Sequence, residues 1–220
     1  MSDTEIRTRV YRSDLRLRQA EETRRNIIDA AAELFSELGY AGTTLAKIAK
    51  RAGVSVETVQ KNGPKAALIR AAVEFRSFGV EGDRDVFEIA SGQALLALTE
   101  IDQAAPLAAR TMLEVNAASA GVWTALTGAA HGDTELRAYF DLFLRDIRRQ
   151  NSRLLGVLAE RGWLRDDIDF ERAVDTWEII SCVETYVRLV VLTGRSHDEY
   201  RAWFEQAVDE MILRSPAQRS

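Results

Sequence analysis

The stretch Thr44–Lys65, TLAKIAKRAGVSVETVQKNGPK, decides the fold of this chain. Its apolar residues recur at helical spacing on both sides of Gly53, which predicts two short helices separated by a turn. Thr44 and Ser55 stand at expected N-caps, because their hydroxyls can accept hydrogen bonds from the free amides of a first helical turn. Gly53 tolerates the positive φ that a sharp reversal needs. The stretch therefore predicts a helix-turn-helix, with an ordinary hairpin in a helical core as the alternative.

The flanking sequence supplies helices on both sides of this motif. The first is expected over residues 23–38, where Gly39 ends an apolar face formed by Ile27, Ile28, Ala31, Leu34, Phe35 and Leu38. The two helices of the motif are expected over 44–50 and 55–61, and a fourth over 64–78. These helices predict a compact head at the N-terminal end of an all-α chain.

The run over residues 24–72, RRNIIDAAAELFSELGYAGTTLAKIAKRAGVSVETVQKNGPKAALIRAA, resembles the DNA-binding domain of TetR-family transcriptional regulators. The matching elements are LFSELGY, GTT, IAKRAGVS and a short helix containing TV, followed by Lys65 and Leu68. The resemblance implies a three-helix head with a helix-turn-helix, joined to a larger helical bundle that binds a ligand and forms a dimer. It does not extend to the rest of the chain, which diverges within that family.

The end of the second motif helix departs from the family pattern. Family members usually show an aromatic pair, as in TVYRHFGSKEAL, whereas this chain has the shorter segment TVQKNGPKAAL. Gln60 stands where the tyrosine would fall, and no phenylalanine precedes Gly63. Gln60 can still hydrogen-bond to a phosphate or to a base edge. The packing role of the missing phenylalanine is left open by the sequence.

The resemblance also names the residues expected to touch DNA, with 55–61 in the major groove. Thr44 and Lys65 match family positions that contact phosphates. Polar side chains of the second motif helix are the expected base readers, because amides and short polar groups can address base edges. The full set of DNA-binding candidates is Thr44, Ser55, Glu57, Thr58, Gln60, Lys61 and Lys65.

The distribution of charge agrees with a nucleic-acid partner for the head. Residues 1–80 carry 14 Lys and Arg against 10 Asp and Glu, a net charge of +4, whereas residues 81–220 carry 15 against 24, a net charge of −9. Phosphate binding depends on local charge, so the overall value of −5 does not exclude DNA.

Composition and motifs exclude several other classes of protein. No uncharged apolar run is long enough to span a membrane, and the charged start lacks the apolar core of a signal peptide. The single cysteine, Cys182, cannot form an intrachain disulfide, which favours a cytoplasmic setting. There is no glycine-rich phosphate loop, metal-ligand spacing or nucleophile motif, so we expect no enzyme, no metal and no cofactor.

Three domains are expected: a flexible, arginine-rich arm over 1–22, the helix-turn-helix domain over 23–80, and a helical ligand-binding and dimerisation domain over 81–215. The arm either enters a minor groove or is a frayed terminus. Further helices are expected over 83–101, 106–118, 120–127, 134–161, 170–193 and 198–213. The last two are more apolar than one packed face requires, which favours a homodimer through them, with a larger monomeric core as the alternative.

A ligand pocket is expected in the helical body, because such pockets are mostly apolar with a few polar groups. The candidates for its lining are Met112, Asn116, Trp123, Phe143, Trp177, Ser181 and Glu184, although aromatic residues at helical spacing also serve as ordinary core. Glu184 could instead pair with Arg188 one turn later.

The sequence therefore predicts a homodimeric, sequence-specific DNA-binding regulator, most often a repressor in this family, that recognises a pseudo-palindromic operator and is released by a small molecule. The alternative is a helical small-molecule-binding or interaction protein that has lost sequence-specific DNA binding, which the shortened recognition segment favours.

Overall fold

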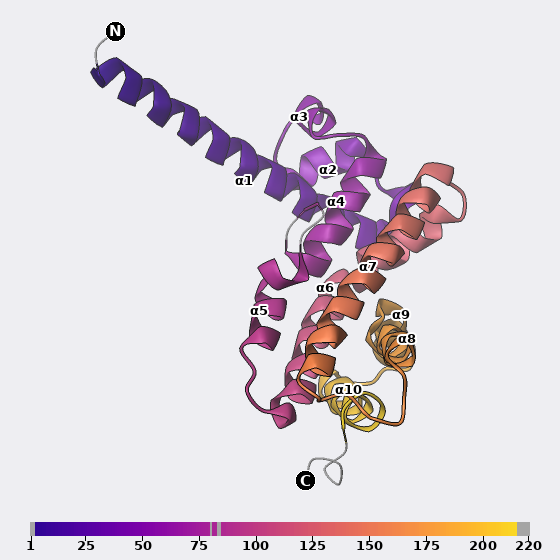
Figure 1. Ribbon diagram of the computed structural model, residues 1–220. Helices are drawn as coiled ribbons and strands as arrows, with labels where there is room; N and C mark the ends of the chain where they lie inside the picture. Colours follow the sequence, from indigo (N-terminus) through magenta and orange to yellow (C-terminus); the bar gives the residue numbers. More distant parts are fainter. Residues whose placement is uncertain (1–2, 80, 83–84, 215–220) are drawn as a thin grey trace.

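A computed structural model describes residues 3–79, 81–82 and 85–214, with side chains from Leu17 onward. Within that part the regular structure is helical, apart from one isolated bridge between Leu164 and Leu213, so the all-α fold class is confirmed. The head contains α1 (Asp3–Gly42), α2 (Leu45–Ala52), α3 (Val56–Lys61) and α4 (Lys65–Phe78). Figure 1 shows α1 extending well beyond the rest of the molecule at its N-terminal end.

Helix α1 continues through residues 3–22, where the sequence predicts a flexible arm. This segment holds neither glycine nor proline, so nothing in it interrupts a helix. The side chains of residues 3–16, including most of the arm's arginines, and the whole of residues 215–220 lie outside the described residues. The predicted domain boundaries at 22, 80 and 215 remain predictions.

Gly39 interrupts α1 as predicted, although the helix resumes for one further turn. Its φ of 68° and ψ of 176° lie outside the helical range, and only glycine adopts this combination readily. Thr43 is fully buried, and its hydroxyl lies 3.0 Å from the carbonyl oxygen of Leu34 and 2.9 Å from that of Gly39, which share its one hydrogen. This side chain therefore fixes the direction in which the chain leaves α1 and enters α2.

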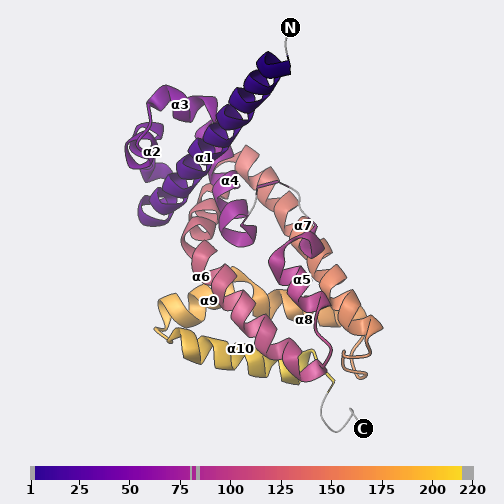
Figure 2. The ribbon, with the colours of Figure 1, turned by 90° about the vertical axis from the view of Figure 1, so that its left-hand side faces the viewer.

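The body begins with short elements and continues with long helices. Its elements are η1 (Val86–Glu88), α5 (Ala90–Leu96), η2 (Ile101–Gln103), α6 (Ala104–Ala130), α7 (Thr134–Glu160), α8 (Phe170–Ser181), α9 (Val183–Tyr186), the π-helix η3 (Val187–Leu192) and α10 (His197–Met211). Helix α6 is the central element, because it packs against α1 and α4 of the head and against α7, α9 and α10 of the body. Figure 2 shows α8 to α10 at the end of the body remote from α2 and α3.

Three predicted helices of the body have the wrong boundaries. The predicted helix over 83–101 is replaced, in its described part 85–101, by η1, α5 and the start of η2. Here η1 folds back on α5, so that a Cβ at Gly92 would lie 2.0 Å from the carbonyl oxygen of Val86. Residues 106–118 and 120–127 belong instead to the single helix α6. Gly121, within α6, lets this helix approach α1 closely, since a Cβ there would lie 2.5 Å from that of Ser36.

The predicted helix over 170–193 is also wrong, because it is broken at Cys182. Cys182 has an extended backbone, with φ −66° and ψ 153°, between α8 and α9. The break frees the carbonyl oxygen of Ser181, which accepts a hydrogen bond of 3.1 Å from Asn116 Nδ2 on α6. A side chain far away in sequence therefore stabilises the break, which explains why local periodicity did not reveal it.

Candidate functional site

The turn between α2 and α3 has the geometry that the sequence predicts. Thr44 Oγ1 accepts from the Lys47 amide at 3.2 Å, and Ser55 Oγ accepts from the Thr58 amide at 3.1 Å, so both residues are N-caps. Gly53 has φ 68° and ψ 29°, in the left-handed region, and its amide donates to the carbonyl oxygen of Ala49. The two short helices are therefore held at a fixed angle by their own caps and turn.

Helix α3 presents a polar, exposed face. Glu57, Gln60 and Lys61 are exposed, and no hydrogen bond of their side chains is made within the described part of the chain. The hydroxyl of Thr58 is different, because it lies 2.9 Å from Ser55 Oγ and is half-buried. Three of the four predicted base readers are therefore free to contact a ligand, whereas Thr58 already has a partner.

Lys65 is bound within the head rather than extended into solvent. Its ammonium donates to the carbonyl oxygens of Tyr40, at 3.0 Å, and Thr43, at 3.3 Å. It also lies 4.1 Å from the centre of the Tyr40 ring, in a cation–π contact. An ammonium has three donors, so one N–H remains for a phosphate. Lys65 thus fastens α4 to the end of α1 and holds its charge beside α2.

Hydrogen bonds hold the C-terminal end of α3, where the sequence lacks the aromatic pair. Asn62 Nδ2 donates to the carbonyl oxygen of Thr58 at 2.8 Å. Arg24 of α1 donates to the carbonyl oxygen of Asn62 at 3.1 Å and pairs with Glu81 after α4. Val59 supplies the apolar anchor and is fully buried. Polar contacts to α1 therefore position the end of this helix.

A second set of ion pairs fixes α2 on α1. Arg51 donates to Glu37 at 2.9 and 3.2 Å and to Glu33 at 2.8 Å. These hydrogen bonds lower the pKa of the Glu37 carboxyl below its ordinary value. Because all three side chains are substantially exposed, the main effect is to orient α2 rather than to stabilise the fold strongly.

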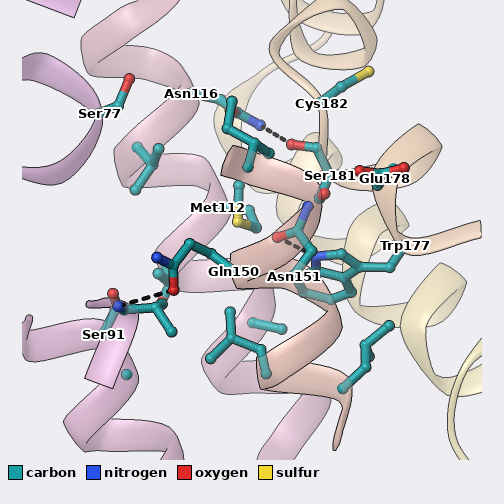
Figure 3. A pocket seen from close by; sticks show the side chains of 18 of the residues that line it. Ser77, Ser91, Met112, Asn116, Gln150, Asn151, Trp177, Glu178, Ser181 and Cys182 are labelled. Carbon is teal, nitrogen blue, oxygen red and sulfur yellow. Dashed lines mark hydrogen bonds between the residues drawn. The ribbon is translucent and has the colours of Figure 1, made fainter. Parts of the chain in front are cut away.

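The body encloses a cavity of about 540 Å³, a volume typical of small-molecule sites. Its wall is formed mainly by apolar side chains of α4 to α8, and Figure 3 shows its polar residues. Six of the seven predicted pocket residues line it: Met112, Asn116, Trp123, Trp177, Ser181 and Glu184. Phe143 is not among the lining residues; it lies behind the wall, against Trp123, Tyr139 and Phe78.

Asn116 joins three helices at one wall of this cavity. Its Nδ2 donates to the Ser181 carbonyl of α8 and, at 3.1 Å, to the Tyr200 hydroxyl of α10. Burial raises the pKa of Tyr200 to about 12, and the hydrogen bond from Asn116 opposes that rise. Figure 3 shows Asn116 joined to Ser181, and on another wall Trp177, whose Nε1 donates to Asn151 Oδ1 at 3.2 Å.

Glu184 makes a different contact from the one that its spacing suggests. Its carboxylate accepts from Trp123 Nε1 at 2.7 Å, and it forms no ion pair with Arg188 in the described part of the chain. The contact joins α9 to α6 across the edge of the cavity. Helical spacing predicted the wrong partner because Arg188 lies in the π-helix, where the spacing of side chains differs from that of an α-helix.

Helix α4 connects this cavity with the head. Ser77 and Phe78, at its C-terminal end, line the cavity, while Lys65 at its other end contacts α1. Glu74 accepts from the Tyr139 hydroxyl of α7 at 2.9 Å. Burial and this neighbouring carboxylate raise the pKa of Tyr139, which therefore remains a neutral donor. Helix α4 is therefore part of both the cavity wall and the head.

Residues 27–61 match the sequence family described as bacterial regulatory proteins of the tetR family. The matched region contains the capped helices, the glycine turn and the exposed face of α3. This segment of the head therefore has the sequence pattern of the tetR family. No curated protein matches the sequence.

The whole chain has the fold of TetR-family structures. It is similar to a TetR-family transcriptional regulator from Mesorhizobium loti, with 22% identity, a TM-score of 0.67 and coverage of 87% of this chain and 96% of that one. It is also similar to FadR from Bacillus subtilis in complex with stearoyl-CoA, with 18% identity, a TM-score of 0.63 and coverage of 85% and 96%. A regulator from Saccharomonospora viridis in complex with choline has 17% identity, a TM-score of 0.63 and coverage of 88% and 98%.

The TetR-type head contains two candidate contacts that the sequence analysis missed. Val56 is 40% exposed at the start of α3, where an apolar side chain can contact a thymine methyl group. Lys47 is exposed in the first turn of α2, and its ammonium donates to the Gly42 carbonyl at 2.8 Å. Helix periodicity does not reveal the exposure of Val56, because Val56 stands three residues before the buried Val59 and so on nearly the same face of α3.

The described residues contain no cluster of three potential metal ligands. None of their helices is both long enough and apolar enough to cross a membrane.

Proposed function

We propose that this chain is a homodimeric transcriptional regulator of the TetR type, most often a repressor in that family, whose affinity for a pseudo-palindromic operator is lowered by a small molecule. The observation that carries the proposal is that α4 belongs both to the DNA-binding head and to the wall of the cavity. TetR-family regulators are transcription factors rather than enzymes, and the cytoplasm is the proposed location.

Contacts to DNA would come from the exposed face of α3 and from the ends of neighbouring helices. Glu57, Gln60 and Lys61 would reach base edges or phosphates in the major groove, since their side chains have no other partner in the described head. Thr44 and Lys65 would contact phosphates on either side, with Lys65 using its remaining N–H. Ser55 would act mainly as the cap that positions this face.

A molecule in the cavity would act on DNA binding through α4. It would touch Phe78, whose ring lies 6.0 Å from that of Phe143, which in turn stacks on Tyr139 at 5.6 Å. Tyr139 donates to Glu74 one turn earlier in α4. A ligand that prefers one position of these rings would shift the population of head orientations by its difference in affinity for the two positions.

A homodimer would place two heads on one operator. Large apolar side chains remain exposed on the last helices, at Phe170, Ile179, Val191, Leu192 and Met211. Ile179 and Leu192 are about 70% exposed (69% and 73%), which supports a partner surface over α8 and η3. An isologous contact would relate the heads by a two-fold axis and predict half-sites separated by about 34 Å or a multiple of it.

The test is a selection of random DNA duplexes by the purified protein at about 50 mM and about 200 mM salt, a range over which phosphate-driven affinity falls steeply. An inverted repeat recovered at the higher salt would support the proposal. Weak, sequence-blind binding that disappears with salt would contradict it and favour a helical small-molecule-binding or interaction protein instead, as the six-residue α3 suggests.

Gln60→Ala is the most informative variant for this selection, because Gln60 is exposed and its side chain has no partner in the described head. We expect relaxed preference at one or two operator positions with unchanged stability. Thr44→Ala is the control, because losing a cap weakens the helix by about 1 kcal/mol and lowers affinity for every sequence alike.

A further inference from the structure

The buried wall of the cavity carries neutral polar groups rather than charges. Asn116 is 1% exposed and Ser181 is 6% exposed, and both line the cavity. The buried lining that surrounds them is apolar and includes Leu155, Leu158 and Val208. A charged group placed against this wall would lose its hydration without gaining a counter-ion.

The charged residues of the lining are already neutralised or lie in water. Arg148 pairs within the lining with Glu178, so these two charges balance. It also pairs with Asp175 at 2.8 Å and with Glu171 at 3.0 Å, which do not line the cavity and are 66% and 75% exposed to water. Arg145 and Glu184 are exposed and have opposite signs, so together they favour neither an anion nor a cation. Glu184 is also held by the Trp123 indole.

Asn116 offers one unused acceptor. A carbonyl oxygen can only accept, so the contact with Ser181 requires the Nδ2 of Asn116 on that side and fixes the orientation of the amide. The Nδ2 uses both of its hydrogens, on Ser181 and Tyr200. Within the described part of the chain no hydrogen bond is made to Asn116 Oδ1 or by Ser181 Oγ. Asn116 and Ser181 line the cavity, so these two atoms are available to a bound molecule, and one that pairs them gains hydrogen bonds within an otherwise apolar site.

We infer that the cavity binds an uncharged, mainly apolar molecule that carries a hydroxyl or N–H donor, which bonds to Asn116 Oδ1. The inference rests on the proposed function, because the bound molecule is taken to be the effector that lowers operator affinity. This class differs from the charged ligands, stearoyl-CoA and choline, that are bound in two structures of similar fold. Because Asn116 also holds α8 and α10, a ligand there would act on the helices of the proposed dimer surface as well as on α4.

The test measures binding of four probes with the same alkyl chain by calorimetry: decan-1-ol, 1-methoxydecane, decanoate and decyltrimethylammonium. We expect decan-1-ol to bind at least about tenfold more tightly than its methyl ether, which lacks the donor. Decanoate and decyltrimethylammonium should bind at least about a hundredfold more weakly than the alcohol. Tightest binding of either ion, equal binding of alcohol and ether, or binding of none of the four would overturn the inference.

Ala108→Trp locates the site, because Ala108 lines the cavity and a large side chain there would fill it. Ala117→Trp is the control, since Ala117 is exposed on the same helix and is not among the lining residues. We expect loss of decan-1-ol binding in the first variant only, and equal binding in both would overturn the assignment to this cavity. The DNA selection on the same preparation separates the two proposals, because an operator recovered without alcohol binding refutes only the effector class.

Discussion

The close approach of α6 to α1 at Gly121 predicts a measurable response to a single methyl group. A Cβ at this position would lie 2.5 Å from Ser36 Cβ, 2.6 Å from its Oγ and 3.2 Å from its Cα. The Cα and Cβ of Ser36 are fixed by the backbone of α1, so rotation of the side chain can move only Oγ away. Overpacking of this kind costs about 1–3 kcal/mol, whereas replacing glycine by alanine within a helix contributes about 1 kcal/mol of stability.

Gly156→Ala is the matched control, because Gly156 also lies within a 27-residue helix and nothing lies within 4 Å of a Cβ built there. We expect Gly156→Ala to stabilise the protein by up to about 1 kcal/mol. Gly121→Ala should be less stable than this control by about 1–3 kcal/mol, which corresponds to about 2–4 °C in Tm for each kcal/mol in a chain of this size.

Urea unfolding of both variants, followed by circular dichroism, measures this difference. Ser36→Gly should relieve the clash, so the double variant should recover at least about 1 kcal/mol of the loss relative to the sum of the single changes. Equal stability of Gly121→Ala and Gly156→Ala would refute the reasoning. Because Ser36 belongs to the head and Gly121 to the body, Gly121→Ala should also change operator affinity, which the control should leave unaltered.

Three further predictions follow from charges and burial. If Lys61 neutralises one phosphate, Lys61→Ala should weaken binding to every DNA sequence and reduce the slope of log K against log salt by about 0.9. Lys65→Ala should have the same effect on DNA binding and should also destabilise the head, because Lys65 joins α4 to α1. Unchanged affinity across a salt titration would remove either assignment. Leu192→Asp should raise the dimer dissociation constant, measured by sedimentation, at least about a hundredfold, because each subunit would bury one carboxylate in the symmetric contact. Leu96→Asp is the control and should have no effect, because Leu96 is exposed on α5, outside the last helices. Burial raises the pKa of Tyr200 to about 12, so with rising pH the unfolded chain loses the phenol proton before the folded protein does. The free energy of unfolding should therefore be constant below about pH 10 and fall by up to about 1.4 kcal/mol per pH unit between about pH 10 and pH 12. Urea unfolding measures this decline, which Tyr200→Phe should make shallower.

The sequence by itself determined the head. Its caps, its glycine turn and its apolar stripes are local features, and each specifies the conformation of residues within one or two turns of itself. For that reason Thr44, Gly53 and Ser55 have the predicted roles, and the expected helices of the head agree with α2, α3 and α4 to within about two residues. Six of the seven pocket candidates also lie around one cavity, because aromatic and polar residues on the inner faces of helices converge when those helices pack together.

Only the tertiary structure decided the features that depend on distant partners. Gly121 was expected to lie in a short helix over 120–127, but it lies within the long helix α6 and allows close packing against Ser36 of α1. The break at Cys182 depends on a hydrogen bond from Asn116, 65 residues from Ser181 in the chain. Glu184 contacts Trp123 rather than Arg188, and Phe143 supports the cavity from behind without lining it. In each case the energy comes from a contact between separate helices, and helical periodicity reports which face of a helix is buried but not which residue it meets.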